Sequence, residues 1–139
     1  MDRHTIHLEM SHDHALADEL NALDLECRFD DTKWPGRYEL HIIKKGNENL
    51  GFCVIALNCS SPEVAKFFIC PDFRKTGLAV IAAHRVFEYI EREHGATYSL
   101  QIRDKIDCQE SVWRFWCNAL QGRSATQSGL NFLVGNWDQ

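Results

Sequence analysis

The residues best suited to chemistry in this chain lie between a short apolar run and a long helical pattern. The run 67–71 (Phe-Phe-Ile-Cys-Pro) predicts the end of a buried strand, because the proline that closes it cannot donate to a sheet ladder. Arg74, Lys75 and Gly77 follow, and apolar residues then recur at helical spacing over 78–90. The first N–H groups of a helix are unpaired, and the helix dipole makes that end partly positive. The sequence therefore predicts an anion site, for which phosphate is the natural ligand.

The same stretch carries a resemblance to a known family. The pattern Ile69-x-Pro71-x-Phe73-Arg74-x-x-Gly77-x-Ala79 resembles the acyl-CoA-binding motif of the GNAT N-acetyltransferases. The resemblance implies that acetyl-CoA is the cofactor and that the loop amides grip the diphosphate of coenzyme A. The residues it assigns to cofactor binding are Ile69, Arg74, Lys75, Thr76, Gly77, Leu78 and Ala79. The alternative is an ordinary strand–loop–helix connection with a glycine where the chain bends, and the context of strand and helix distinguishes the two.

Length and composition limit the classes of protein. A chain of 139 residues predicts one domain, 1–139, and a 45% apolar fraction is enough to form a core. The net charge of −5 provides no overall basic footprint for nucleic acid. No apolar run approaches the roughly 18–20 residues of a membrane span, and the N-terminus lacks the apolar core of a signal peptide. We therefore expect a cytoplasmic protein that does not bind membranes.

The cysteines and histidines do not form a recognisable metal motif. None of the cysteines makes a Cys-x-x-Cys pair and most have apolar neighbours, so reduced core thiols are expected. Four histidines lie close together near the N-terminus, but strand alternation and helix spacing would scatter them, so we predict no metal site. The cysteines are Cys27, Cys53, Cys59, Cys70, Cys108 and Cys117, and the clustered histidines are His4, His7, His12 and His14.

The remaining elements follow from hydrophobic periodicity and turn residues. Strands are predicted at 5–10, 37–44, 50–57, 64–70, 96–103, 123–127 and 130–134, and helices over 16–27, over 78–94 and from a cap at Asp107 to Gly122. The strand–helix–strand unit in the middle implies a parallel pair of strands. The order β-α-β-β-β-α-β-α-β-β is a mixed α/β arrangement and resembles the GNAT fold, which usually has a second helix before its second strand.

Acetyl transfer to an amine needs a group that polarises the carbonyl and a base that takes the amine proton. The resemblance implies that the main-chain N–H of Ile69 meets the acetyl carbonyl. The central strand, predicted from residue 64, carries no acid, and Glu63 lies about 20 Å from Ile69 along an extended chain. That distance is too long for direct proton transfer. Glu39, His41 and Tyr98 on neighbouring strands are the candidates for the base, each with a solvent-facing role as the alternative.

The general acid is where the sequence departs from the family. Relatives commonly carry a tyrosine on the last helix, but Trp116 stands at the matching position, and a shift of one residue puts Phe115 there. An indole N–H can donate a hydrogen bond but is not a proton acid near neutral pH. Ile69 and Tyr98 remain the candidate catalytic residues, and neither register places a phenol on the last helix.

Two functions remain open from the sequence. The first is an acetyl-CoA-dependent N-acetyltransferase acting on an unidentified amine of a small molecule or protein. The second is a catalytically weak or inactive binding or regulatory protein with the same fold, such as phages and mobile elements encode. The four tryptophans can form a partner surface, and the final hairpin allows two subunits to pair.

Overall fold

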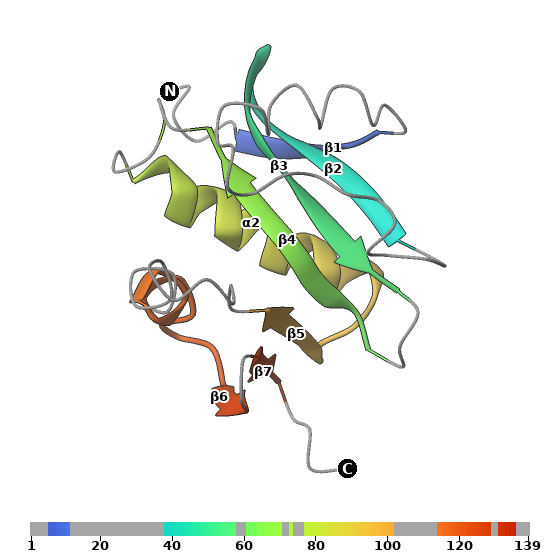
Figure 1. Ribbon diagram of the computed structural model, residues 1–139, viewed down its shortest axis with the longest axis vertical. Helices are drawn as coiled ribbons and strands as arrows, with labels where there is room; N and C mark the ends of the chain where they lie inside the picture. The colour runs from blue at the N-terminus through green and yellow to red at the C-terminus, as the bar shows by residue number, and fades with distance from the viewer. Residues whose placement is uncertain are drawn as a thin grey trace.

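The computed structural model describes residues 6–11, 38–57, 61–70, 73, 77–101, 114–128 and 131–135. Figure 1 shows a twisted sheet with helix α2 along one face. The elements are β1 (Ile6–Ser11), β2 (Tyr38–Lys45), β3 (Glu48–Ala56), β4 (Glu63–Ile69), α2 (Leu78–Glu93), β5 (Tyr98–Gln101), β6 (Ala125–Ser128) and β7 (Asn131–Val134). Residues 114–119 form a further helical segment, which we call the last helix.

The seven described strands form one sheet in the order β1-β2-β3-β4-β5-β7-β6. The strands from β1 to β4 pair antiparallel with their neighbours, as do β5 with β7 and β6 with β7. Strands β4 and β5 pair in parallel, which confirms the strand–helix–strand prediction. The predicted mixed α/β fold is therefore confirmed, while the predicted first helix, over 16–27, lies outside the described residues.

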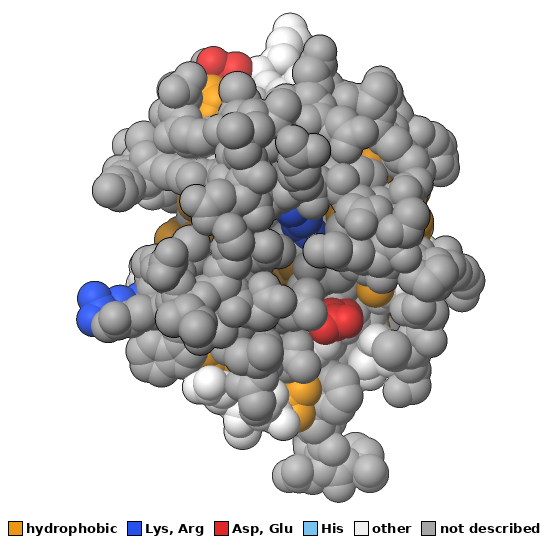
Figure 2. Space-filling model, in the orientation of Figure 1, with side chains coloured by type: hydrophobic (Ala, Val, Ile, Leu, Met, Phe, Trp, Pro, Cys, Tyr) orange, Lys and Arg blue, Asp and Glu red, His pale blue; other side chains and the backbone are white. Residues whose placement is uncertain are grey.

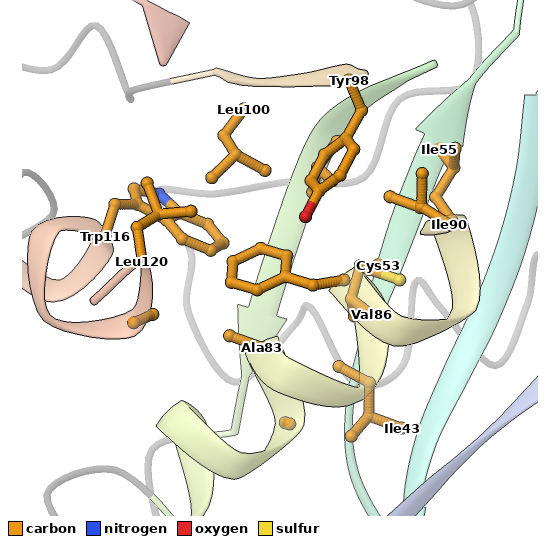
Figure 3. Close-up of a cluster of buried hydrophobic side chains, with 14 of the residues drawn as sticks. Ile43, Cys53, Ile55, Ala83, Val86, Ile90, Tyr98, Leu100, Trp116 and Leu120 are labelled. Carbon is orange, nitrogen blue, oxygen red and sulfur yellow. The ribbon is translucent and has the colours of Figure 1, made fainter. Parts of the chain in front are cut away.

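The sheet separates two hydrophobic clusters. On one face, α2 and the last helix pack over β3, β4 and β5, and their shared core includes the fully buried side chains of Phe87, Ile90 and Leu100. Figure 3 shows this cluster, with Val86 and Ile90 of α2 facing Ile55 of β3. Burying such a side chain is worth roughly 1.5–3 kcal/mol. The second cluster, on the other face, consists of Leu40, Ile42, Phe52, Val54, Ala56, Phe68 and Cys70.

Most predicted boundaries agree with the structure to within two residues, and two differences matter. The central strand begins at Glu63 and not at residue 64, so the prediction that this strand carries no acid is wrong. In the final hairpin Ser128 pairs with Asn131, so Ser128 belongs to β6 and not to the turn predicted at Ser128-Gly129. Both differences arise because hydrogen-bonded pairing sets the end of a strand, whereas hydrophobic periodicity and turn residues indicate it only to within a residue or two.

The described side chains on the face drawn in Figure 2 show no single charged region. Among them, acidic and basic groups lie as separate spots between hydrophobic ones. In the described part of the chain, no helix has the length and apolar character that a bilayer span requires. The same residues contain no group of three or more His, Cys, Asp or Glu side chains placed to hold a metal ion.

Candidate functional site

The candidate site lies where the chain leaves β4 and begins α2. The Cys70 amide donates to the Leu50 carbonyl on β3 at 2.7 Å, and the Phe73 amide donates to the Cys70 carbonyl at 2.9 Å. Successive N–H groups of an extended chain point to opposite edges, so the Ile69 N–H points away from β3, toward the β5 side. The side chain of Ile69 itself is buried on the α2 face. This orientation is the one that a main-chain donor to a ligand between β4 and β5 requires.

Gly77 forms the N-cap of α2 in a left-handed conformation, with φ of 85° and ψ of −14°. It makes no side-chain capping bond, and the first turn of α2 contains no acidic residue. A Cβ atom added to Gly77 would have open space around it, so the positive φ and not crowding favours glycine here. Gly77 is exposed, and Leu78 and Ala79 are half-buried. The helix start therefore presents a partly positive, accessible end to solvent.

Strands β4 and β5 are paired over only a short distance. Their described pairing consists of Glu63 with Ser99 and Val64 with Leu100, all at the start of β4. The register between β3 and β4 shifts just after this point, because Val54 pairs with Lys66 while Ile55 pairs with Val64. This β-bulge leaves one extra residue in β4 and changes the direction of the strand. Among the described residues, the later half of β4 has no pairing with β5.

Gly51 on β3 sets the spacing at the other edge of the site. It pairs with Ile69. An added Cβ atom would overlap the Phe68 carbonyl oxygen and come within 2.9 Å of the Ile69 Cα atom. Gly51 is not among the site residues predicted from the sequence, although a glycine inside a strand pattern is a known sign of close backbone approach.

The residues predicted from the sequence are only partly brought together. Ile69 is the last residue of β4, Gly77 is the N-cap of α2, and Leu78 and Ala79 are the first residues of that helix. The predicted phosphate contacts at residues 74–76 lie outside the described residues.

The candidate bases lie in three different places. Glu63 stands at the point where β4 and β5 are still paired, and burial raises the pKa of its carboxyl group. Glu39 and His41 lie on β2 and are hydrogen-bonded to each other at 2.9 Å, near the C-terminal end of α2. Tyr89, which contacts Glu39, is 12 residues after Gly77, or about 18 Å along the helix. The structure therefore separates Glu39 and His41 from the start of α2.

Tyr98 is fully buried in the core against Phe87, with ring centroids 5.9 Å apart. Its hydroxyl donates to Glu91 Oε2 at 2.7 Å, and Arg123 binds the same carboxylate at 2.9 and 3.2 Å. Burial, followed by the hydrogen bond to Glu91, raises the pKa of Tyr98. These contacts give Tyr98 a role in holding α2 to β5.

Trp116 on the last helix is also a core residue, with 4% of its surface exposed. Its ring lies 5.2 Å from that of Phe67 on β4 and 6.1 Å from that of Phe87 on α2, measured between centroids. Phe115 stacks on Phe67 at 5.7 Å. The position that the resemblance matched to a tyrosine is therefore occupied by an aromatic core residue beside β4.

Comparison with known proteins places the fold. No protein-family model and no curated protein sequence matches the chain, but many solved structures do. A Bacillus subtilis acetyltransferase in complex with CoA has a TM-score of 0.63 at 11% identity, covering 93% of this chain and 95% of its own. The putative N-acetyltransferase YhhK from Escherichia coli, bound to coenzyme A, has a TM-score of 0.66 at 11% identity, covering 95% and 98%.

A third match is the ribosomal-protein-S18-alanine N-acetyltransferase from Escherichia coli, with a TM-score of 0.61 at 11% identity, covering 96% of this chain and 98% of its own. A further match, from Desulfovibrio desulfuricans, is described as a putative acetyltransferase of the GNAT family and has a TM-score of 0.64 at 12% identity. The chain therefore has the GNAT acetyltransferase fold along almost its whole length.

Proposed function

We propose that this protein binds acetyl-CoA and transfers the acetyl group to an amine. The observation that carries the proposal is the arrangement at the end of β4. There an exposed helix start at Gly77, without a side-chain capping bond, follows a strand whose Ile69 N–H points toward β5. Coenzyme A in the matched structures from Bacillus subtilis and Escherichia coli supports the choice of cofactor. A helix start alone would bind many anions, whereas a helix start together with the Ile69 N–H suits a diphosphate that carries a long extended chain.

The two ends of acetyl-CoA would contact different parts of the site. The diphosphate would lie against the main-chain N–H groups at 77–79, with Arg74, Lys75 and Thr76 as further contacts. The thioester arm would run back along the later half of β4, at the edge away from β3, so that the Ile69 N–H donates to the acetyl oxygen as negative charge develops there. The amine then attacks the carbonyl carbon, the carbon–sulfur bond breaks, and the amine proton balances the departing thiolate.

Glu63 is the base that we propose, because burial raises its pKa and it lies in the paired start of β4, just before the last described pair with β5. A raised pKa makes a carboxylate a better proton acceptor near neutral pH. Its distance from Ile69 along the strand means that the proton would pass through water. Tyr98 has no part in this proposal, because its hydroxyl is buried and bonded to Glu91.

The second candidate function is binding without efficient turnover. It is favoured by one observation, the burial of Trp116 where relatives carry a tyrosine acid. Removing a general acid costs about 10²–10⁴ in rate, so a protein that keeps the cofactor site can still be a slow catalyst or a binding protein.

Two assays test the proposal in sequence. Thermal unfolding is measured with acetyl-CoA, coenzyme A and an adenine nucleotide, and a ligand at 100 times its dissociation constant adds about 2.7 kcal/mol of stability. Thiol release is then followed with acetyl-CoA and a panel of amines. Stabilisation by both thioester and thiol with amine-dependent release supports the transferase, whereas stabilisation without release supports the binding protein. The absence of any stabilisation would reject both.

A further inference from the structure

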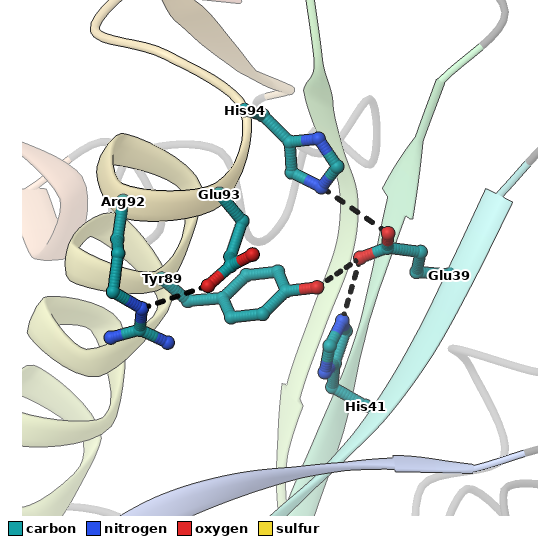
Figure 4. A network of polar contacts seen from close by, with 6 residues as sticks. All are labelled: Glu39, His41, Tyr89, Arg92, Glu93 and His94. Atoms are coloured by element: carbon teal, nitrogen blue, oxygen red, sulfur yellow. Dashed lines mark hydrogen bonds and ion pairs between the residues drawn. The ribbon is translucent and has the colours of Figure 1, made fainter.

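A cluster of polar side chains joins β2 to the C-terminal end of α2. Glu39 Oε1 accepts hydrogen bonds from His41 Nε2 at 2.9 Å and from the Tyr89 hydroxyl at 2.8 Å. The other oxygen, Oε2, lies 3.2 Å from His94 Nε2. Figure 4 shows the three partners converging on this one carboxylate. Because Glu39 and Tyr89 are 50 residues apart, the cluster ties two elements that are distant in the sequence.

His41 is the member of the cluster whose bonding is incomplete. Only 1% of its surface is exposed, and its buried Nδ1 atom has no hydrogen-bond partner among the described residues. An ionised carboxylate can only accept, so Nε2 must carry the proton that is shared with Glu39. In the neutral ring Nδ1 is then a bare acceptor, and the edge of the ring packs against Tyr89 at a centroid distance of 4.5 Å.

The charges around the cluster favour this state. Burial would raise the pKa of Glu39, but hydrogen bonds from His41 and Tyr89, with the charge of His94, hold it below its ordinary value. Burial lowers the pKa of His41, and the bond to Glu39 only partly offsets this. The titratable or charged groups that face the cluster are Glu39 on β2, Cys53 on β3, and Tyr89, Arg92, Glu93 and His94 at the end of α2. On β1 the residue paired with His41 is Met10, which carries no charge.

We propose that Glu39, His41, Tyr89 and His94 form a proton-controlled clasp, which is closed while His41 carries one ring proton and weakens when it takes up a second. A second proton would place an N–H donor at Nδ1, which makes no hydrogen bond within the described part of the chain. A buried donor without a partner is costly, so protonation favours an open state in which Nδ1 reaches water.

The segment that would open is the end of α2. There the amides of His94 and Gly95 both donate to the Ile90 carbonyl, at 2.8 and 2.9 Å. His94 is the C-cap of the helix and also a member of the clasp. Loss of the clasp would therefore release the last turn first. This inference does not depend on the proposed acetyl transfer, because the clasp lies at the opposite end of α2 from Gly77.

The test is hydrogen exchange of the His94 and Gly95 amides between pH 7.5 and 5, corrected for the intrinsic pH dependence of exchange. Protection of these amides in the unmodified protein should fall below about pH 6.5, by up to about tenfold per pH unit for one proton taken up on opening. A His41→Phe variant keeps the ring but cannot titrate, and its protection should be independent of pH. His84→Phe is the matched control, since His84 lies on the same helix and contacts the Ala119 carbonyl at 3.0 Å.

The outcomes divide clearly. A pH-dependent loss of amide protection that disappears in His41→Phe and persists in His84→Phe supports the clasp. The same pH dependence of protection in His41→Phe would overturn it. The ring-nitrogen NMR signals of His41 in the unmodified protein decide the matter if that variant does not fold. A neutral ring with its proton on Nε2 at pH 7 is the expected result. A proton on Nδ1 at that pH would overturn the proposal.

Discussion

The close approach of β3 and β4 at Gly51 gives the sharpest prediction for the site. In a Gly51→Ala variant the new methyl group would overlap the Phe68 carbonyl oxygen and lie 2.9 Å from the Ile69 Cα atom, closer than Cβ atoms are normally found. Both contacts are with backbone, so no side chain can rotate away and β4 must move. Overpacking of this kind costs about 1–3 kcal/mol, and we expect the free energy of unfolding in urea to fall by that amount.

The same shift should change ligand binding in a selective way. Moving β4 displaces the Ile69 N–H, which we propose to bond to the acetyl oxygen, and one such bond is worth about 0.5–1.5 kcal/mol. Acetyl-CoA should therefore bind the variant about two- to tenfold more weakly, while coenzyme A, which has no acetyl oxygen, should lose less. Calorimetric titration of the two ligands measures the difference.

Gly135→Ala is the matched control. An added Cβ atom at Gly135 would meet the Ala96 carbonyl, away from the turn between β4 and α2. We expect this variant to lose stability but to keep the relative affinities of the two ligands. Surface substitutions ordinarily change the free energy of unfolding by no more than about 0.5 kcal/mol. If Gly51→Ala changes it by no more than that, or lowers the affinity for both ligands equally, the reasoning about β4 is refuted.

Three further substitutions separate catalysis from stability. Because burial raises the folded-state pKa of Glu63, its effect on stability becomes less favourable as pH rises through that pKa. The free energy of unfolding of Glu63→Gln in urea at pH 7 should thus be no lower than that of the unmodified protein. Its rate of acetyl transfer should be at least about a hundredfold lower if Glu63 is the base. Tyr98→Phe removes the hydrogen bond to Glu91 and should cost about 1–2 kcal/mol in urea, with cofactor affinity unchanged. Trp116→Ala should cost about 3–5 kcal/mol in the same assay.

Local patterns were enough to predict most of the sheet. The hairpin of β2 and β3 and the limits of α2 follow from alternation and from glycines at turns, which depend on neighbouring residues. The start of β4 at Glu63 could not be found this way, because it is set by pairing with Ser99 on β5. The β-bulge at the same place adds a residue that no periodicity reveals.

The candidate site was predictable only where it is contiguous in the sequence. The motif from Ile69 to Ala79 predicted the end of β4 and the start of α2. The roles of Glu39, His41 and Tyr98 instead depend on partners far along the chain. Tyr98 alternates like a half-exposed strand residue, yet α2 covers it and Glu91 holds its hydroxyl. Nothing in the local sequence distinguishes Glu39 from other strand carboxylates, because its partners Tyr89 and His94 come from α2 and its C-cap.

The most direct test of the account is the map of backbone amide shifts when coenzyme A is titrated into isotope-labelled protein. We predict the largest changes at Ile69 and over 77–79, with little change at the His94 end of α2. A diphosphate gripped by main-chain nitrogens at the helix start must change these signals. Changes confined to other strands, or no saturable change at millimolar coenzyme A, would contradict the proposed cofactor site.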